Sequence, residues 1–178
     1  MPRSRIRYIF TYGTLMSTCT GQQGRRERNL LARTAQNLGT AAIRGRLFEA
    51  GLCPAGIRDA GPSDRIQGEV WELSSEHQAV LAALDDYEGC GPLSPRPAPY
   101  RRTRIRPRLA DGRRVTAWMY VWSLPTDTLT PVSDGRWQEA HAISTRAAAC
   151  AIEPSGQIRR GRAPIARRPA ARAARRSP

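Results

Sequence analysis

Hydrophobic and polar positions divide the first part of the chain into short strand-like runs and two helical runs. Residues 8–12 are aromatic or β-branched without a breaker, which is typical of a buried strand. Further strands are predicted over residues 40–48, where Gly45 indicates a bulge or a close backbone contact, and over residues 67–73. The pattern therefore predicts a sheet built from segments that are far apart in the sequence.

A hairpin is predicted near the middle of the chain. Residues 100–109 alternate arginine with apolar or β-branched residues, Asp111-Gly112 is a hairpin turn signal, and residues 115–122 form the return strand. The arginines have two interpretations: a basic motif that binds phosphate, or the wet face of a strand. The turn signal favours the strand.

Three segments are predicted to lack regular structure. Residues 17–24 are polar and form a surface loop, residues 51–57 (GLCPAGI) form a constrained turn, and residues 91–99 contain four prolines and form a loop. These segments separate the strands.

Two helices are predicted. The first covers residues 25–36 with a modest apolar stripe, and Gly39 ends it. The second begins at Ser75, where a Gln three residues later gives the spacing of a capping box, and Gly89 ends it.

Glu88 stands at the last turn of the second helix, on or beside its apolar face. A buried carboxylate at a helix C-terminus is disfavoured by desolvation and by the helix dipole, so its pKa is expected to rise. The alternative is that Glu88 leans outward or pairs with one of the many arginines. Asp85 and Asp86 are expected to face water.

Gly13-Thr14 stops the first strand abruptly. Glycine permits a sharp bend and a close approach, so the N–H groups that follow Tyr12 can point at one atom as an oxyanion cradle. The alternative is an ordinary strand followed by a loop.

Charge and length divide the chain into a domain over residues 1–137 and a tail over residues 138–178. Each part carries a net charge of +7, because the domain has 20 Arg and 13 acidic residues and the tail has 9 Arg and 2 acidic residues. The tail could contact nucleic acid through phosphates, but it has no aromatic residue for stacking, which favours a solvated tail. A short alanine-rich helix over residues 141–152 and disorder over residues 153–178 are predicted.

The four cysteines form no C-x-x-C pair, and only two histidines could supplement them, so a zinc site is not expected. The chain has no long apolar run. We therefore expect no metal or cofactor, no membrane association, and a reduced, cytoplasmic protein.

Six motifs follow one another in an order that resembles the gamma-glutamylcyclotransferase-like superfamily, in particular its AIG2-like and gamma-glutamylamine cyclotransferase branch. They are Tyr12-Gly13-Thr14-Leu15, Gly45-Arg46-Leu47-Phe48 with its Gly51, Pro54 and Gly56 turn, Gln67-Gly68-Glu69-Val70, Leu84-Asp85-Asp86-Tyr87-Glu88-Gly89, Tyr100-Arg101-Arg102, and Ala117-Trp118-Met119-Tyr120-Val121. Together they cover about residues 6–137.

The resemblance implies an α+β fold, a compact mixed β-barrel with a few flanking helices and a pocket at one mouth. It also implies that the loop of Tyr12, Gly13, Thr14 and Leu15 holds a γ-glutamyl group and that Glu88 is the general acid/base. Three features depart from the family, because Cys53 stands where an aromatic residue is common, the loop over residues 91–99 is unusually rich in proline, and the tail has no counterpart.

The implied reaction is intramolecular aminolysis by a cyclising transferase. The α-amino group of a γ-glutamyl compound attacks its own γ-carbonyl, which closes 5-oxoproline and expels an amine. Glu88 can move the proton, and the amides from Gly13 to Leu15 can receive the negative charge. Tyr12 and Tyr120 could orient the substrate or fill the core, and Tyr100 and Arg102 are expected at the entrance.

Two other functions remain open at this stage. One is a non-enzymatic module of the same fold that binds a small γ-glutamyl or acidic ligand. The other is a nucleic-acid-associated protein that acts through its basic tail.

Overall fold

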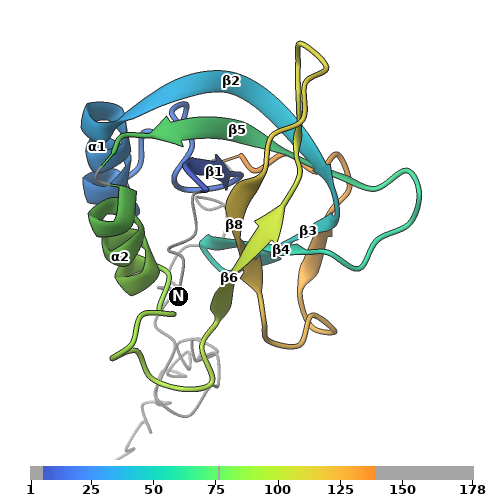
Figure 1. The fold of residues 1–178 in the computed structure, drawn as a ribbon. Helices are drawn as coiled ribbons and strands as arrows, with labels where there is room; N and C mark the ends of the chain where they lie inside the picture. The colour runs from blue at the N-terminus through green and yellow to red at the C-terminus, as the bar shows by residue number, and fades with distance from the viewer. Residues whose placement is uncertain (1–5, 76, 139–178) are drawn as a thin grey trace, which may run out of the picture.

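The computed structural model describes residues 6–75 and 77–138, which form two helices and nine strands (Figure 1). In chain order these are β1 (Tyr8–Thr11), α1 (Arg25–Thr34), β2 (Ala35–Arg44), β3 (Arg46–Ala50), β4 (Cys53–Ile57), β5 (Arg65–Leu73), α2 (His77–Tyr87), β6 (Tyr100–Ile105), β7 (Arg108–Leu109), β8 (Ala117–Trp122) and β9 (Thr130–Val132). The α+β class predicted from the sequence is confirmed.

The strands form two sheets. A six-stranded sheet has the order β6-β8-β1-β5-β2-β7, and a three-stranded sheet has the order β4-β3-β9. The first strand lies near the middle of the larger sheet, antiparallel to β5 and parallel to β8. Strands β2 and β3 join the two sheets at Gly45, but the sheets do not close into one continuous barrel.

The two faces of the central strands bury different sets of side chains. On β1, Ile9 packs toward the helices, whereas Phe10 packs into the interior between the sheets. Strand β8 follows the same alternation, with Tyr120 on the helix side and Met119 inside. This period of two is what a strand buried on both faces requires.

Both helices lie beside the same end of β2 and β5 (Figure 1). Helix α2 buries Val80, Leu81 and Leu84, and α1 buries Leu31. The apolar stripes predicted from the sequence therefore face the sheet. Gly89, with φ of 67°, follows α2 as predicted.

Strand β2 is longer than predicted. The first helix ends at Thr34, and the strand begins directly at Ala35. Gly39 does not end the helix, because it lies in a break of register between Asn37 and Thr40 on β2. The side chain of Asn37 accepts a hydrogen bond from the Gly39 N–H at 2.7 Å, which stabilises this bulge.

The segment predicted as a turn at residues 51–57 is also mostly a strand. Strand β4 pairs with β3 and lies at the edge of the three-stranded sheet. Pro54 is tolerated there because an edge strand leaves one row of N–H groups without a ladder partner.

The predicted hairpin is present but broken. Strand β6 ends at Ile105, and after Pro107 the short β7 pairs with β2, while β6 pairs with β8. The turn at Asp111-Gly112 is confirmed, because Gly112 has φ of 88° and its N–H donates to the Leu109 carbonyl at 3.0 Å. The loop predicted over residues 91–99 is also confirmed.

The helix predicted over residues 141–152 and the disorder predicted over residues 153–178 lie outside the described residues. Within the described part of the chain, no helix has both the length and the apolar character needed to cross a membrane.

Candidate active site

The turn that follows β1 is buried over its whole length, from Tyr12 to Leu15. The Gly13 carbonyl closes the turn by accepting a hydrogen bond from the Met16 N–H at 2.9 Å. Within residues 6–75 and 77–138, no group accepts a hydrogen bond from the N–H groups of Gly13, Thr14 or Leu15. These three amides therefore have no described acceptor, and their use as an oxyanion cradle stays a prediction.

Gly13 is required by close packing against β4. A Cβ atom at this position would lie 2.0 Å from Cγ of Pro54, so no side chain fits. The turn is thus pressed onto the edge strand, which fixes the direction of its amides.

The hydroxyl of Tyr12 binds two other strands. It donates to the Tyr120 carbonyl at 2.7 Å and accepts from the Gly56 N–H at 3.3 Å. Burial and the nearby charge of Glu88 raise the pKa of Tyr12 well above its usual value. The neutral hydroxyl of Tyr12 therefore links the turn after β1 to β4 and β8 by hydrogen bonds. Contact between Tyr12 and substrate stays a prediction.

Helix α1 and the end of α2 hold the same turn from the other side. Oγ1 of Thr14 lies 3.0 Å from the hydroxyl oxygen of Tyr87. The guanidinium of Arg28 donates to the Thr14 carbonyl at 2.6 Å and to the Gln23 carbonyl at 2.6 Å. The turn therefore depends on groups from both helices.

Glu69 is a positioning residue that the sequence analysis missed. Its carboxylate is buried on β5 and accepts hydrogen bonds from the Ser17 N–H at 2.8 Å, the Ser17 hydroxyl at 2.7 Å and the Asn37 amide at 3.2 Å. This carboxylate anchors the loop that leaves the turn. Its place in the motif Gln67-Gly68-Glu69-Val70 was the signal that could have identified it.

Glu88 follows α2 directly, and its N–H still donates to the Leu84 carbonyl at 2.9 Å. The residue is partly exposed, but protein atoms surround its carboxyl so closely that burial is the largest cause raising its pKa to about 8. The charges of Glu27 and Asp85 raise this pKa further. No described arginine forms an ion pair with Glu88, so the alternative of an arginine partner is wrong for the described residues.

Several tyrosines surround this carboxyl. The charge of Glu88 contributes to raising the pKa values of Tyr12, Tyr87, Tyr100 and Tyr120, although burial is the largest cause in each case. Tyr87 rises to about 12. The predicted residues are therefore close enough to Glu88 to respond to its charge, although they come from different segments: Tyr12 from the turn after β1, Tyr100 from β6 and Tyr120 from β8.

Asp85 does not face water as expected. Nη1 of Arg102 lies 3.0 and 2.9 Å from its two carboxylate oxygens, and the Tyr120 hydroxyl donates to Oδ1 at 2.8 Å. The Arg102 guanidinium also lies 5.1 Å from the centre of the Trp118 ring. Asp85 therefore anchors two of the predicted site residues, whereas Asp86 is exposed as expected.

Tyr100 lies deeper than the entrance that was expected for it. Its side chain is buried against Trp122, with 5.1 Å between the ring centres, and its hydroxyl donates to the Pro54 carbonyl at 2.8 Å. Contact between Tyr100 and substrate stays a prediction.

Metal-ligating residues are scattered. The described residues contain no group of three or more His, Cys, Asp or Glu side chains that could hold a metal ion. Cys19 and Cys90 form no disulfide, whereas Cys53 is disulfide-bonded, which differs from the reduced state that was expected for the chain.

Comparison with known proteins shows the family of the chain. Residues 9–139 match the model of the family described as gamma-glutamyl cyclotransferase, AIG2-like. No curated protein sequence matches the chain.

Three solved structures resemble this fold. YkqA from Bacillus subtilis has a TM-score of 0.55 and 24% identity over 79% of this chain and 43% of its own, so the chain spans less than half of YkqA. An AIG2-like protein from Mus musculus has a TM-score of 0.52 and 17% identity, covering 72% of this chain and 86% of its own. YtfP from Escherichia coli has a TM-score of 0.50 and 27% identity, covering 75% and 98%.

Proposed function

The chain belongs to the gamma-glutamyl cyclotransferase, AIG2-like family, and from that premise we propose that it releases 5-oxoproline and a free amine from a small γ-glutamyl compound. In this proposal Glu88 is the general acid/base and the turn from Tyr12 to Leu15 is the substrate and oxyanion cradle. A cytoplasmic location belongs to the same proposal.

The observation that carries the proposal is the state of Glu88. A carboxyl with a pKa of about 8 and no cation partner among the described residues can accept and return a proton near neutral pH. The ionised form of Glu88 does not stabilise the folded protein, because desolvation and the neighbouring acidic groups oppose ionisation. Its environment suits proton transfer.

The reaction needs three proton movements. The α-ammonium group of the substrate gives a proton to the Glu88 carboxylate, and the neutral nitrogen attacks the γ-carbonyl carbon to form the ring C–N bond. Glu88 then gives this proton to the leaving nitrogen as its bond to the γ-carbon breaks. The ring nitrogen still carries two hydrogens after the attack and loses one of them to the departing amine. The products are therefore 5-oxoproline and the protonated amine, and the Glu88 carboxylate is regenerated.

Charge on the former carbonyl oxygen is stabilised by the turn. The three free amides from Gly13 to Leu15 are the described donors that suit this oxygen. They are held by Pro54, Arg28 and Glu69, so little reorganisation is needed when the charge develops.

The ion pair beside Glu88 has an orienting role in this proposal. Arg102 and Tyr120 both bind Asp85, which leaves Arg102 close to the site without neutralising Glu88. Through its remaining donors, Arg102 can bind the α-carboxylate of the substrate.

The test is 5-oxoproline release from γ-glutamyl amines, γ-glutamyl amino acids and glutathione by the wild type, Glu88→Gln and the matched control Asp86→Asn. Asp86 is an exposed carboxylate two residues away, so its variant removes a charge without touching the site. We expect Glu88→Gln to lower kcat by about 100-fold or more and Asp86→Asn to change it by less than about 2-fold.

Turnover by Glu88→Gln at the wild-type rate would contradict the assigned role. Binding of a γ-glutamyl compound by the folded wild type with no release across the panel would favour the alternative, a non-enzymatic ligand-binding module. Release that depends on Glu88 would identify the substrate class in the same experiment.

A further inference from the structure

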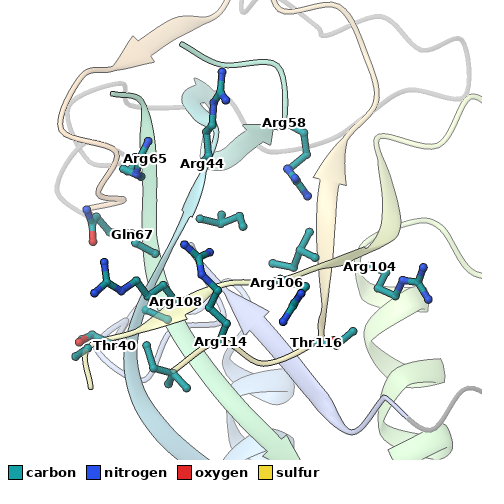
Figure 2. Close-up of a pocket in the computed structure, with 16 residues that line it drawn as sticks. Thr40, Arg44, Arg58, Arg65, Gln67, Arg104, Arg106, Arg108, Arg114 and Thr116 are labelled. Atoms are coloured by element: carbon teal, nitrogen blue, oxygen red, sulfur yellow. The ribbon is translucent and has the colours of Figure 1, made fainter. Parts of the chain in front are cut away.

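A concave surface lies at the opposite end of β2 and β5 from the two helices. It has a volume of about 1060 Å³ and is formed by the second half of β2, the start of β5, the end of β6, and β7 (Figure 2). None of the residues assigned to the active site lines it. We call it the arginine hollow because seven arginines line it: Arg44, Arg58, Arg65, Arg104, Arg106, Arg108 and Arg114.

No acidic side chain accompanies these arginines in the lining. Arg44 donates to the carbonyls of Ala60 and Gly61, and Arg65 donates to those of Pro62 and Asp64. The side chains of the other five form no hydrogen bond or ion pair with any described residue. The hollow therefore holds five exposed guanidinium groups that have no acidic partner among the described residues.

The positions of the arginines follow from several elements. On β2 and β7 the buried partners Ile43 and Leu109 fill the core, which turns the neighbouring Arg44 and Arg108 outward. Arg58, after β4, and Arg114, after the hairpin turn, extend toward the hollow from opposite sides (Figure 2). Arg58 and Arg114 thus approach each other from segments that are remote in the sequence, whereas the side chain of Arg104 points away from the hollow (Figure 2).

Convergence of like charges has an electrostatic cost that arginine cannot relieve by losing a proton. Only solvent, counterions or a bound anion can offset it. The planar donor fork of a guanidinium matches phosphate oxygens in a bidentate manner. The neutral donors Gln67, Thr40 and Thr116 on the rim can bind the same oxygens.

The lining and the volume of the hollow indicate which kind of anion it can bind. The lining contains no aromatic ring on which a nucleic-acid base could stack. The volume is close to the upper range of small-ligand sites, about 300–1000 Å³. The C-terminal segment is a poor occupant, because residues 138–178 carry a net charge of +7 themselves.

We propose that the arginine hollow is a binding site for a compact ligand that carries several phosphate groups, recognised through those phosphates. The site is separate from the proposed active site and does not depend on its activity.

The test is calorimetric titration of the full chain with sodium tripolyphosphate at about 0.1 M salt, where only closely held charges escape screening. The variant is Arg108→Gln with Arg114→Gln, and the matched control is Arg33→Gln with Arg136→Gln, which removes two exposed arginines outside the hollow. We expect binding by the wild type, a loss of about 10-fold or more in the hollow variant, and less than about 2-fold in the control.

Four outcomes would overturn the proposal. They are no binding by the wild type, equal losses in both double variants, equal binding of sulfate at matched ionic strength, and tighter binding of a single-stranded oligonucleotide through the same arginines. Circular dichroism of both variants ensures that a loss of binding reflects the side chains and not the fold.

Discussion

The two ends of the sheet treat unpaired charge in opposite ways. Beside the helices, Arg102 binds Asp85 and Arg28 binds backbone carbonyls, while the carboxyl of Glu88 has no described cation partner. In the arginine hollow, five guanidinium groups have no described anion partner. One end of the sheet therefore has a carboxyl group without a described cation partner, and the other end has guanidinium groups without a described anion partner.

This difference shows that the function open to a charged group without a partner depends on whether the group can lose its charge. A buried carboxylate without a cation partner can take up a proton and become neutral, and it can later give this proton to another group. A guanidinium keeps its charge at any pH that the protein experiences, so it stays hydrated or binds an anion. We therefore assign proton transfer to the first end and anion binding to the second.

Packing is also tighter at the candidate active site than at the arginine hollow. A Cβ at Gly13 would lie 2.0 Å from Pro54, whereas the exposed Ala110 lies on the open wall of the hollow. The largest expected effect follows from this contrast. We expect Gly13→Ala to lower the free energy of unfolding by about 3 kcal/mol, because the turn or β4 must move, and Ala110→Ser to change it by less than about 0.5 kcal/mol. Denaturant unfolding measures both, and equal effects would break the contrast.

The unusual protonation of Glu88 gives the second effect. Its pKa is raised from 4.5 to about 8 in the folded protein, so the folded state binds this proton more tightly and loses stability as pH rises through that interval. Glu88→Gln removes this loss, so its stability relative to wild type should be greater at about pH 9 than at about pH 6.5, by about 2 kcal/mol.

Thermal unfolding at both pH values measures this difference, which corresponds to about 4–8 °C in Tm. Asp86→Asn is the control and should show no such trend, since that side chain is exposed. A gap that stays constant with pH would show that Glu88 is not a buried, protonatable group.

The hydrogen bond from Tyr120 to Asp85 tests whether the paired charges beside Glu88 are held in place. Tyr120→Phe removes this 2.8 Å bond and should lower the free energy of unfolding by about 1 kcal/mol. The control is Tyr8→Phe, whose hydroxyl forms no hydrogen bond with a described residue. Equal shifts in Tm for the two variants would mean that the Tyr120 hydroxyl does not stabilise the fold and that only its aromatic ring does.

The smallest effect is expected at the hollow in the absence of phosphate. Arg108→Gln with Arg114→Gln relieves repulsion between cations, so it should raise stability by about 0.5 kcal/mol at about 0.01 M salt and by less at high salt. Thermal unfolding over a salt series measures this. A loss of stability at low salt would show that these arginines are already neutralised by groups of the protein.

Local patterns were sufficient for the elements that carry the central residues. The strand that stops at Gly13, the helix that ends at Gly89, and the position of Glu88 at the end of that helix are all readable from residues close in sequence. Each rests on periodicity or on a glycine signal, which act over one or two turns of chain.

Long-range partners were not readable in this way. Nothing beside Asp85 indicates that it binds Arg102, and β4 was hidden because Gly and Pro normally mark turns, although an edge strand tolerates them. The arginines of residues 100–109 were interpreted as the wet face of a strand. The placement of Arg104, Arg106 and Arg108 in one hollow with Arg58 and Arg65 depends on sheet topology, which the sequence pattern does not contain.

The hydrogen bond from the Tyr12 hydroxyl to the Tyr120 carbonyl joins residues 108 positions apart. Contacts of such long range form slowly, because much of the chain must be ordered before they are made. On a ribosome, the first strand and its turn emerge long before β8 can take its place beside them. A nascent chain therefore has no assembled site until its last central strand is synthesised, so any activity of this site reports that folding of the sheet is complete.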